Sequence, residues 1–245
     1  MPGIFGQQPP QFIVVNSRRF LRPCAVLVGV LLSGPASAQM AAQVGVASEN
    51  DYRGNSLSDG KPVATLSIAL DDPGGWFAGG LLGEARFRDY SHDVPQLVVD
   101  AGYAHALSSG LSWEAGVTAS LFPGAASNNY GELFAGVASR RWSARVYVSS
   151  DYYGRGYRTI YSEFNYFHPL NDRLRLLGHV GALHVENIPG HARSNTFDTR
   201  VGIDWRLGDY SLQLQHVDTN RESYAWPVGG TSSEHRWFVS VTHPW

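Results

Sequence analysis

Charged side chains recur at every second position in several stretches of this sequence. In residues 197–207, Asp198, Arg200, Asp204 and Arg206 alternate with apolar or aromatic residues. Successive side chains of a β-strand point to opposite faces, so this spacing predicts one charged and one apolar face. A charged face of this kind can bind water, ions and polar solutes. The same alternation along the chain predicts an inward, pore-lining face made of Glu84, Arg86, Asp100, Glu114, Glu132, Arg145, Glu163, Arg175, His179, Asp198, Arg200, Asp204, Arg206, Glu234 and Arg236.

This predicted interior contains both acidic and basic side chains. A strongly selective channel is expected to show rings of one sign. Two interpretations remain, an ion-pair network that ties neighbouring strands together and a lining that selects solutes, and the first is favoured. If the barrel has a pore, we expect weak discrimination between cations and anions.

The sequence offers little support for catalysis or for a metal site. No G-x-S-x-G nucleophile elbow is present, and Ser91, His92 and Asp93 are consecutive residues in an expected loop. His184, Glu186 and His191 lack the spacing of metal ligands. We therefore expect no enzyme activity, no metal and no cofactor, and an outer-membrane lipid hydrolase is the least favoured alternative.

The elements that must position these charges are strands of about ten residues, the length that a tilted strand needs to cross a bilayer. Short turns, such as 71–75, 108–110 and 208–209, alternate with longer connections, such as 53–60, 122–129 and 219–233. The fold class expected is therefore all-β, a transmembrane antiparallel up-and-down β-barrel of about twelve strands with both termini in the periplasm.

A soluble, lipocalin-like barrel also alternates, but with its apolar face inward. Aromatic residues near the short turns favour the membrane alternative, because they resemble an interfacial girdle. These residues are Trp76, Phe77, Trp113, Trp142, Trp205 and Tyr210. The chain also ends in an alternating strand with a terminal aromatic residue, which predicts an assembly signal for the barrel-assembly machinery at Trp237, Val239, Val241 and Trp245.

The first residues resemble an export signal. Arg18, Arg19 and Arg22 precede the apolar stretch 25–32, and an A-x-A cleavage site follows at 36–38. We expect residues 1–38 to be a signal peptide cleaved near Ala38–Gln39, and residues 39–245 to form a single barrel domain in the outer membrane. Cys24, the chain's one cysteine, lies within this leader.

Net charge and composition indicate which partners to expect. The formal net charge is -2 and only 16% of residues are charged, so nucleic acid is not an expected partner. Expected partners are outer-membrane lipid and lipopolysaccharide, the barrel-assembly machinery and small solutes.

Residues 48–62 contain a motif that resembles the opening signature of the TorF-type porin family, also called the Gcw_chp family of proteobacterial outer-membrane proteins. That signature runs roughly S-D-Y-x-F-R-G-x-S-x-S-D-G-x-P, and this chain lacks the two residues between its Tyr and Arg. Segments 150–154, 176–181 and 204–208 also fit the family. The motif residues are Asp51, Tyr52, Arg53, Gly54, Ser58, Asp59, Gly60 and Pro62.

The resemblance implies a single barrel and passive transport, with no defined substrate. From the residues alone, the motif is interpreted either as a loop that folds over the rim or as a constriction lined by Arg53 and Asp59. We therefore expect a passive diffusion porin for small solutes; the alternative is a plugged structural or adhesive barrel without transport.

Overall fold

The structure of the protein is a computed structural model that describes residues 39–87, 89–107, 110–186, 193–220 and 235–244. The predicted signal peptide (1–38, with Cys24), Arg88, His191, Glu234 and Trp245 lie outside the described residues.

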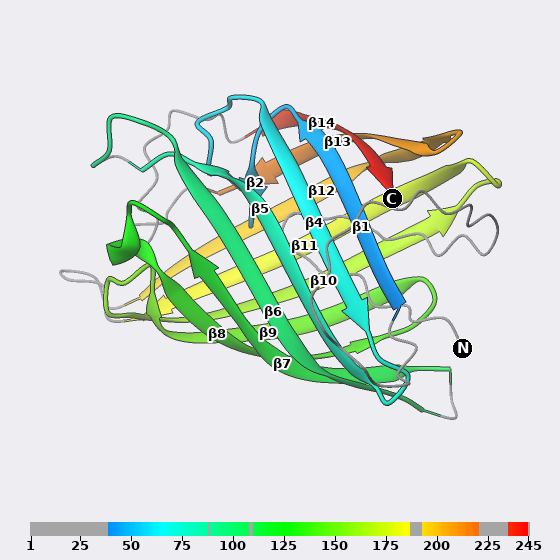
Figure 1. The fold of residues 1–245 in the computed structure, drawn as a ribbon, viewed down its shortest axis with the longest axis horizontal. Helices are drawn as coiled ribbons and strands as arrows, with labels where there is room; N and C mark the ends of the chain where they lie inside the picture. The colour runs from blue at the N-terminus through cyan, green and yellow to red at the C-terminus, as the bar shows by residue number, and fades with distance from the viewer. Residues whose placement is uncertain (1–38, 88, 108–109, 187–192, 221–234, 245) are drawn as a thin grey trace, which may run out of the picture.

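Twelve antiparallel strands close into a barrel, as the alternation predicted (Figure 1). The first strand pairs with both its sequence neighbour and the last strand, so Val46 lies opposite Ala64 on one side and Val241 on the other. Closure pairs the first strand with the last along Gln43–Ala47, which removes the free edge strand that hydrocarbon would not tolerate. The strands are β1 (Gln39–Ala47), β4 (Val63–Asp71), β5 (Trp76–Ala85), β6 (Val94–Ala106), β7 (Ser112–Leu121), β8 (Tyr130–Ala138), β9 (Trp142–Tyr152), β10 (Tyr157–Pro169), β11 (Leu174–Glu186), β12 (Arg193–Leu207), β13 (Tyr210–Thr219) and β14 (His235–Pro244).

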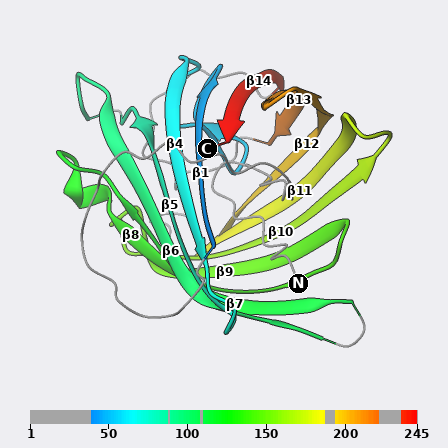
Figure 2. The same ribbon diagram turned by 45° about the vertical axis from the view of Figure 1, so that its right-hand side comes forward.

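The two ends of the barrel differ in their connections. One end, at the right of Figure 1, carries the short turns and the start of β1 and end of β14, and is called the turn end below. The other end, called the loop end, carries the longer connections, including a single 3₁₀ turn (Ala126–Asn128). Figure 2 shows the strands curving round into a ring when the molecule is turned.

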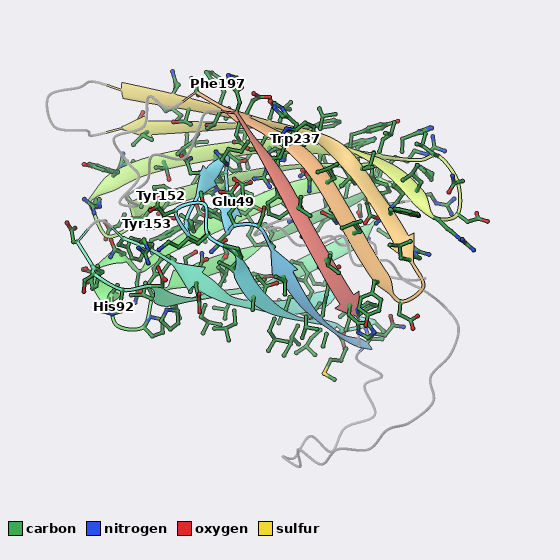
Figure 3. The ribbon with its side chains drawn as sticks, turned by 90° about the horizontal axis from the view of Figure 1, so that it is seen from above. Glu49, His92, Tyr152, Tyr153, Phe197 and Trp237 are labelled. Atoms are coloured by element: carbon green, nitrogen blue, oxygen red, sulfur yellow. The ribbon has the colours of Figure 1, made fainter. Side chains whose placement is uncertain are left out.

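The outer surface of the wall is apolar and exposed. Leu133, Val201 and Trp237 are 60%, 68% and 64% exposed, and Figure 3 shows Phe197 and Trp237 at the outer surface. The inward positions of the same strands are largely polar and buried, for example Asp198, Arg200 and Asp204. This is the reverse of a soluble barrel and fits a wall surrounded by lipid. Among the described residues, no helix is long and apolar enough to cross a membrane.

The aromatic residues expected near the short turns face outward with one exception. Trp76, Trp205 and Tyr210 are exposed near the turn end, and Trp142 stacks on Phe164. Phe77 is the exception, because it is buried on the inward face against Phe134. Its assignment to the interfacial girdle is therefore wrong, and the reason is that Trp76 and Phe77 are adjacent in one strand and must point to opposite faces.

Strand β14 presents the residues of the expected assembly signal on its outer face. Trp237, Val239 and Val241 are exposed there, alternating with buried Arg236, Phe238, Ser240 and Thr242.

Candidate functional site inside the barrel

The segment between β1 and β4 folds into the barrel at the loop end. It forms a hairpin of two short strands, β2 (Asp51–Tyr52) and β3 (Asn55–Ser56), which is called the inner hairpin below. Its turn has Arg53 at φ 49° and Gly54 at φ 73°, the consecutive left-handed residues that a two-residue hairpin turn requires. Asp51, Tyr52 and Arg53 are all buried.

Gly54 brings the hairpin turn into direct contact with the wall. A Cβ atom on this glycine would lie 2.4 Å from Cβ of Asp198 and 3.2 Å from Cβ of Thr219. Only glycine therefore fits, for reasons of both backbone conformation and space.

The acidic side of the inner hairpin contacts two arginines of the wall. Arg236 donates from Nε to Glu49 Oε1 at 2.9 Å and from Nη2 to Asp51 Oδ1 at 2.5 Å. Arg200 Nη2 lies 2.8 Å from Asp51 Oδ2. The register places Val217 of β13 opposite both arginines, so Arg200 and Arg236 flank it in one row across β12, β13 and β14. The two guanidinium groups therefore hold one carboxylate between them.

The basic side of the hairpin contacts the opposite wall. Arg53 donates from Nη1 and Nη2 to the two oxygens of Glu132 at 2.9 and 2.6 Å, a bidentate pair in which both side chains are buried. Its Cζ atom also lies over four tyrosine rings, 4.2–5.6 Å from their centroids, and these are Tyr52, Tyr147, Tyr152 and Tyr161. Glu132 and these rings form an aromatic cage around a cation.

The backbone and side chains at the base of the hairpin fix it further. Asn50 donates from Nδ2 to Gln96 Oε1 at 2.6 Å and to the Glu84 carbonyl at 2.7 Å. Its backbone N–H donates to Ser58 Oγ at 2.9 Å. Leu57 accepts at its carbonyl from the Arg86 N–H at 2.6 Å.

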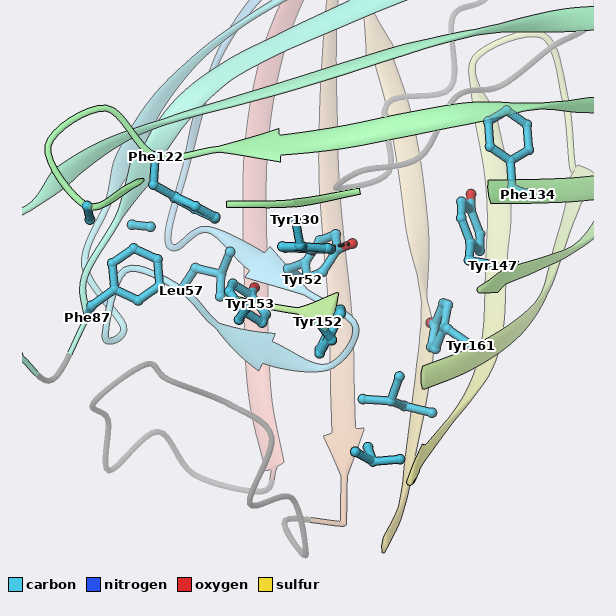
Figure 4. Close-up of a cluster of buried hydrophobic side chains, with 14 of the residues drawn as sticks. Tyr52, Leu57, Phe87, Phe122, Tyr130, Phe134, Tyr147, Tyr152, Tyr153 and Tyr161 are labelled. Carbon is cyan, nitrogen blue, oxygen red and sulfur yellow. Dashed lines mark hydrogen bonds between the residues drawn. The ribbon is translucent and has the colours of Figure 1, made fainter. Parts of the chain in front are cut away.

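An aromatic cluster fills the loop-end interior beside the hairpin (Figure 4). Leu57 of the hairpin segment is fully buried within it. Phe87 meets Phe122 edge to face at 4.8 Å between centroids. Tyr130 donates to the Tyr52 hydroxyl at 3.0 Å. Figure 3 places Glu49, Tyr152 and Tyr153 at this end, enclosed by the strands. The hairpin and the cluster together pack the loop-end half of the interior.

The turn-end half of the interior also contains ion pairs. Arg145 pairs with Glu114 at 2.5 Å, and Arg175 donates from Nε to Asp204 Oδ2 at 2.8 Å. Asp100 and Arg206 are only half-buried there.

His179 has hydrogen-bond partners at both ring nitrogens. Nε2 lies 2.8 Å from Asp198 Oδ1 and Nδ1 lies 2.6 Å from Asn165 Oδ1. The Tyr161 hydroxyl donates to the same Asp198 carboxylate at 3.2 Å. These contacts form an interior polar network around His179.

The structure places most of the predicted interior residues on the inward face. These are Asp100, Glu114, Glu132, Arg145, Glu163, Arg175, His179, Asp198, Arg200, Asp204, Arg206 and Arg236.

The inward placement predicted for Glu84 and Arg86 is wrong. Glu84 is exposed on the outward face of β5, opposite Pro95. Arg86 follows the strand and pairs with Asp93 at 2.6 Å, a contact that lowers the pKa of the Asp93 carboxyl. The inward neighbours of Glu84 in β5 are Gly83 and Ala85, and Ala85 belongs to the aromatic cluster, so charge did not mark the inner face of this strand.

The motif segment does not fold over the rim as a unit. Asp51 to Ser58 insert into the barrel, and Arg53 lies in the packed interior. Asp59 is only half-buried, at φ 58°, and Gly60 and Pro62 are exposed at the rim. The pairing of Arg53 with Asp59 in one constriction is therefore wrong, because the turn at Asp59 directs the chain back out.

Sequence reasoning missed several polar partners of this site. Glu49 and Asn50 lie in the motif segment 48–62 but were not among the predicted site residues, and Gln96 lies in β6. The buried tyrosines were missed as well. The available sequence signal was the Tyr152–Tyr153 pair directly before Gly154, which indicates a turn. In the structure Tyr153 has φ 54°, and this turn places both rings in the interior.

Carboxylates outnumber guanidinium groups among the described inward residues. The carboxylates are Glu49, Asp51, Asp71, Asp100, Glu114, Glu132, Glu163, Asp198 and Asp204, and the guanidinium groups are Arg53, Arg145, Arg175, Arg200, Arg206 and Arg236. Among the described residues, no group of three or more His, Cys, Asp or Glu could hold a metal ion.

Residues 33–244 match the family described as "Bacterial protein of unknown function (Gcw_chp)". The chain belongs to the Gcw_chp family. No curated protein sequence matches it. Among solved structures, it is similar to the KdgM porin (12% identity, TM-score 0.53, 83% of this chain and 98% of that chain). It is also similar to the NanC porin (11% identity, TM-score 0.51, 84% and 99%). At these identities the likeness shows the fold alone, which is that of outer-membrane barrels.

Proposed function

We propose that this Gcw_chp protein is an outer-membrane channel through which small hydrophilic solutes diffuse passively, with weak charge selectivity. The observation that carries the proposal is the charged inner face of the strands, inside a wall with an apolar outer face. The porin function implied by the TorF-type resemblance agrees with it.

Weak selectivity follows from the pairing of interior charges. Arg145 and Arg175 are paired with Glu114 and Asp204, so the described side chains of the turn-end half form no ring of one sign. The excess of carboxylates favours cations slightly.

The inner hairpin supports a second candidate, a closed barrel without transport. It occupies the loop-end interior through buried ion pairs. A channel function requires that the hairpin leave this position part of the time.

Liposome swelling with sugars of graded size separates these candidates. A diffusion channel gives swelling rates that fall with the size of the sugar, and a closed barrel gives the rate of protein-free liposomes at every size. Reversal potentials in a salt gradient then measure selectivity, and strong preference for either ion would contradict the proposal.

Export and assembly belong to the same proposal. The signal peptide directs the chain to the periplasm and is cleaved near Ala38–Gln39. The assembly machinery then binds the outer face of β14. N-terminal sequencing of protein from the outer membrane would locate the cleavage site. Trp237→Ser tests the assembly signal, since it is expected to lower the amount of folded barrel in the membrane.

A further inference from the structure

We propose that the loop-end interior is a binding site for a zwitterionic solute, and that the inner hairpin occupies this site in place of the solute. The solute class has a carboxylate and, separated from it along a side chain, a guanidinium or ammonium group, as in a free basic amino acid or a short peptide with a basic side chain. This inference rests on the proposed channel function and names the solute class that the channel would favour.

The hairpin presents one group of each sign to complementary walls. Asp51 lies between Arg200 and Arg236, and Arg53 lies in the cage formed by Glu132 and four tyrosine rings. Three of these rings, Tyr147, Tyr152 and Tyr161, belong to the wall. An arginine pair of this geometry binds carboxylates in general, and a carboxylate with aromatic rings binds organic cations. The wall therefore holds two subsites of opposite sign, contacted by hairpin residues two positions apart, and both subsites remain if the hairpin moves away.

Tyr161 connects the two subsites. Its ring lies 4.2 Å from Cζ of Arg53, and its hydroxyl donates to Asp198, two residues from Arg200 on the same inward face of β12. A small molecule can therefore contact both subsites at once.

The hairpin is an incomplete ligand for the site. Arg200 Nε and Glu49 Oε2 are buried, and neither has a hydrogen-bond partner among the described residues. Buried polar atoms without partners are unfavourable. A free carboxylate can approach a guanidinium through both Nε and Nη, which the Asp51 side chain does not do at Arg200.

Equilibrium binding tests the inference independently of transport. The refolded barrel with residues 51–56 replaced by a Gly/Ser linker is titrated calorimetrically with L-arginine, L-citrulline and agmatine. Citrulline is nearly isosteric with arginine but has an uncharged side chain, and agmatine lacks the carboxylate. L-arginine is expected to bind at least tenfold more tightly than either analogue, and at least tenfold more tightly than it binds the unmodified chain.

Wall substitutions in the same background assign the subsites. Glu132→Gln should weaken L-arginine at least tenfold and leave citrulline unchanged, whereas Arg200→Gln should weaken L-arginine and citrulline alike and leave agmatine unchanged. Equal binding of the three compounds, or no binding, would overturn the inference.

The outcome is separable from the test of the channel itself. Sugar-dependent swelling with no preference for arginine would refute the binding site and retain the channel. If the linker variant does not fold, as judged by heat-modifiable migration in electrophoresis, the intact chain with Gly54→Ala is titrated instead, and the same two outcomes apply.

Discussion

Replacing Gly54 with alanine should release the inner hairpin, whereas the same change at Gly60 should not. Both glycines have nearly the same left-handed backbone, with φ of 73° and 71°. A Cβ atom at position 54 would lie 2.4 Å from Cβ of Asp198, but at position 60 no atom lies within 4 Å. Gly60→Ala is therefore a matched control that imposes the backbone strain without the contact with the wall.

The difference between the two variants can be estimated. Left-handed backbone at a non-glycine residue costs about 1–2 kcal/mol and is common to both. Overpacking costs about 1–3 kcal/mol more and applies only at position 54. A difference of that size changes the ratio of docked to undocked hairpin by roughly 5–150-fold.

Thiol labelling measures that ratio directly. Asn55→Cys is introduced into the wild-type, Gly54→Ala and Gly60→Ala backgrounds, and the rate of maleimide labelling is compared. Labelling should be roughly 5–150-fold faster in the Gly54→Ala background than in the Gly60→Ala background. The Gly54→Ala variant should also show longer channel openings in planar bilayers. Equal rates in the two backgrounds would refute the claim that contact with the wall holds the hairpin turn.

Three further predictions concern buried charge, pH and the outer face. Arg53→Gln leaves Glu132 buried without its partner and should weaken hairpin docking by about 3–5 kcal/mol, measured by the labelling rate. Adding Glu132→Gln should restore part of the docking. Burial raises the pKa of Asp51 above its ordinary value of 3.8, although Arg200 and Arg236 oppose the shift. The docked state therefore binds the proton more tightly than the undocked state, so acidification toward that value should favour docking and slow labelling, and Asp51→Asn should remove this part of the pH dependence. Leu133→Arg on the outer face should lower the free energy of unfolding in lipid vesicles by about 2–4 kcal/mol in a urea titration, whereas Asp209→Arg in an exposed turn should change it by less than about 0.5 kcal/mol.

Much of the wall could be predicted from the sequence because side chains alternate between the two faces of each strand. Val201 faces lipid and Asp204 faces the interior, so apolar and polar residues alternate with a period of two. Assigning the charged face to the interior failed at Glu84, because the neighbouring inward positions Gly83 and Ala85 carry no charge. Strand periodicity identifies the two faces but does not identify which of them is inside when the interior is locally apolar.

The inner hairpin could not be predicted in the same way. Its short strands resemble a loop in sequence, since Gly54 and Gly60 indicate turns without indicating their direction. Its position depends on contacts with strands that are distant in sequence, such as the pairing of Arg53 with Glu132 and of Glu49 with Arg236. Only the closed barrel brings these partners together.

Single-channel conductance tests most directly whether the protein is a channel whose loop end is closed by its own inner hairpin. The wild-type chain is compared with the variant in which residues 51–56 are replaced by a Gly/Ser linker, both checked for folding. We predict brief, small openings for the wild-type chain and sustained, larger conductance for the variant. Equal conductance would contradict the role of the hairpin, and no conductance from either folded protein would contradict the channel itself.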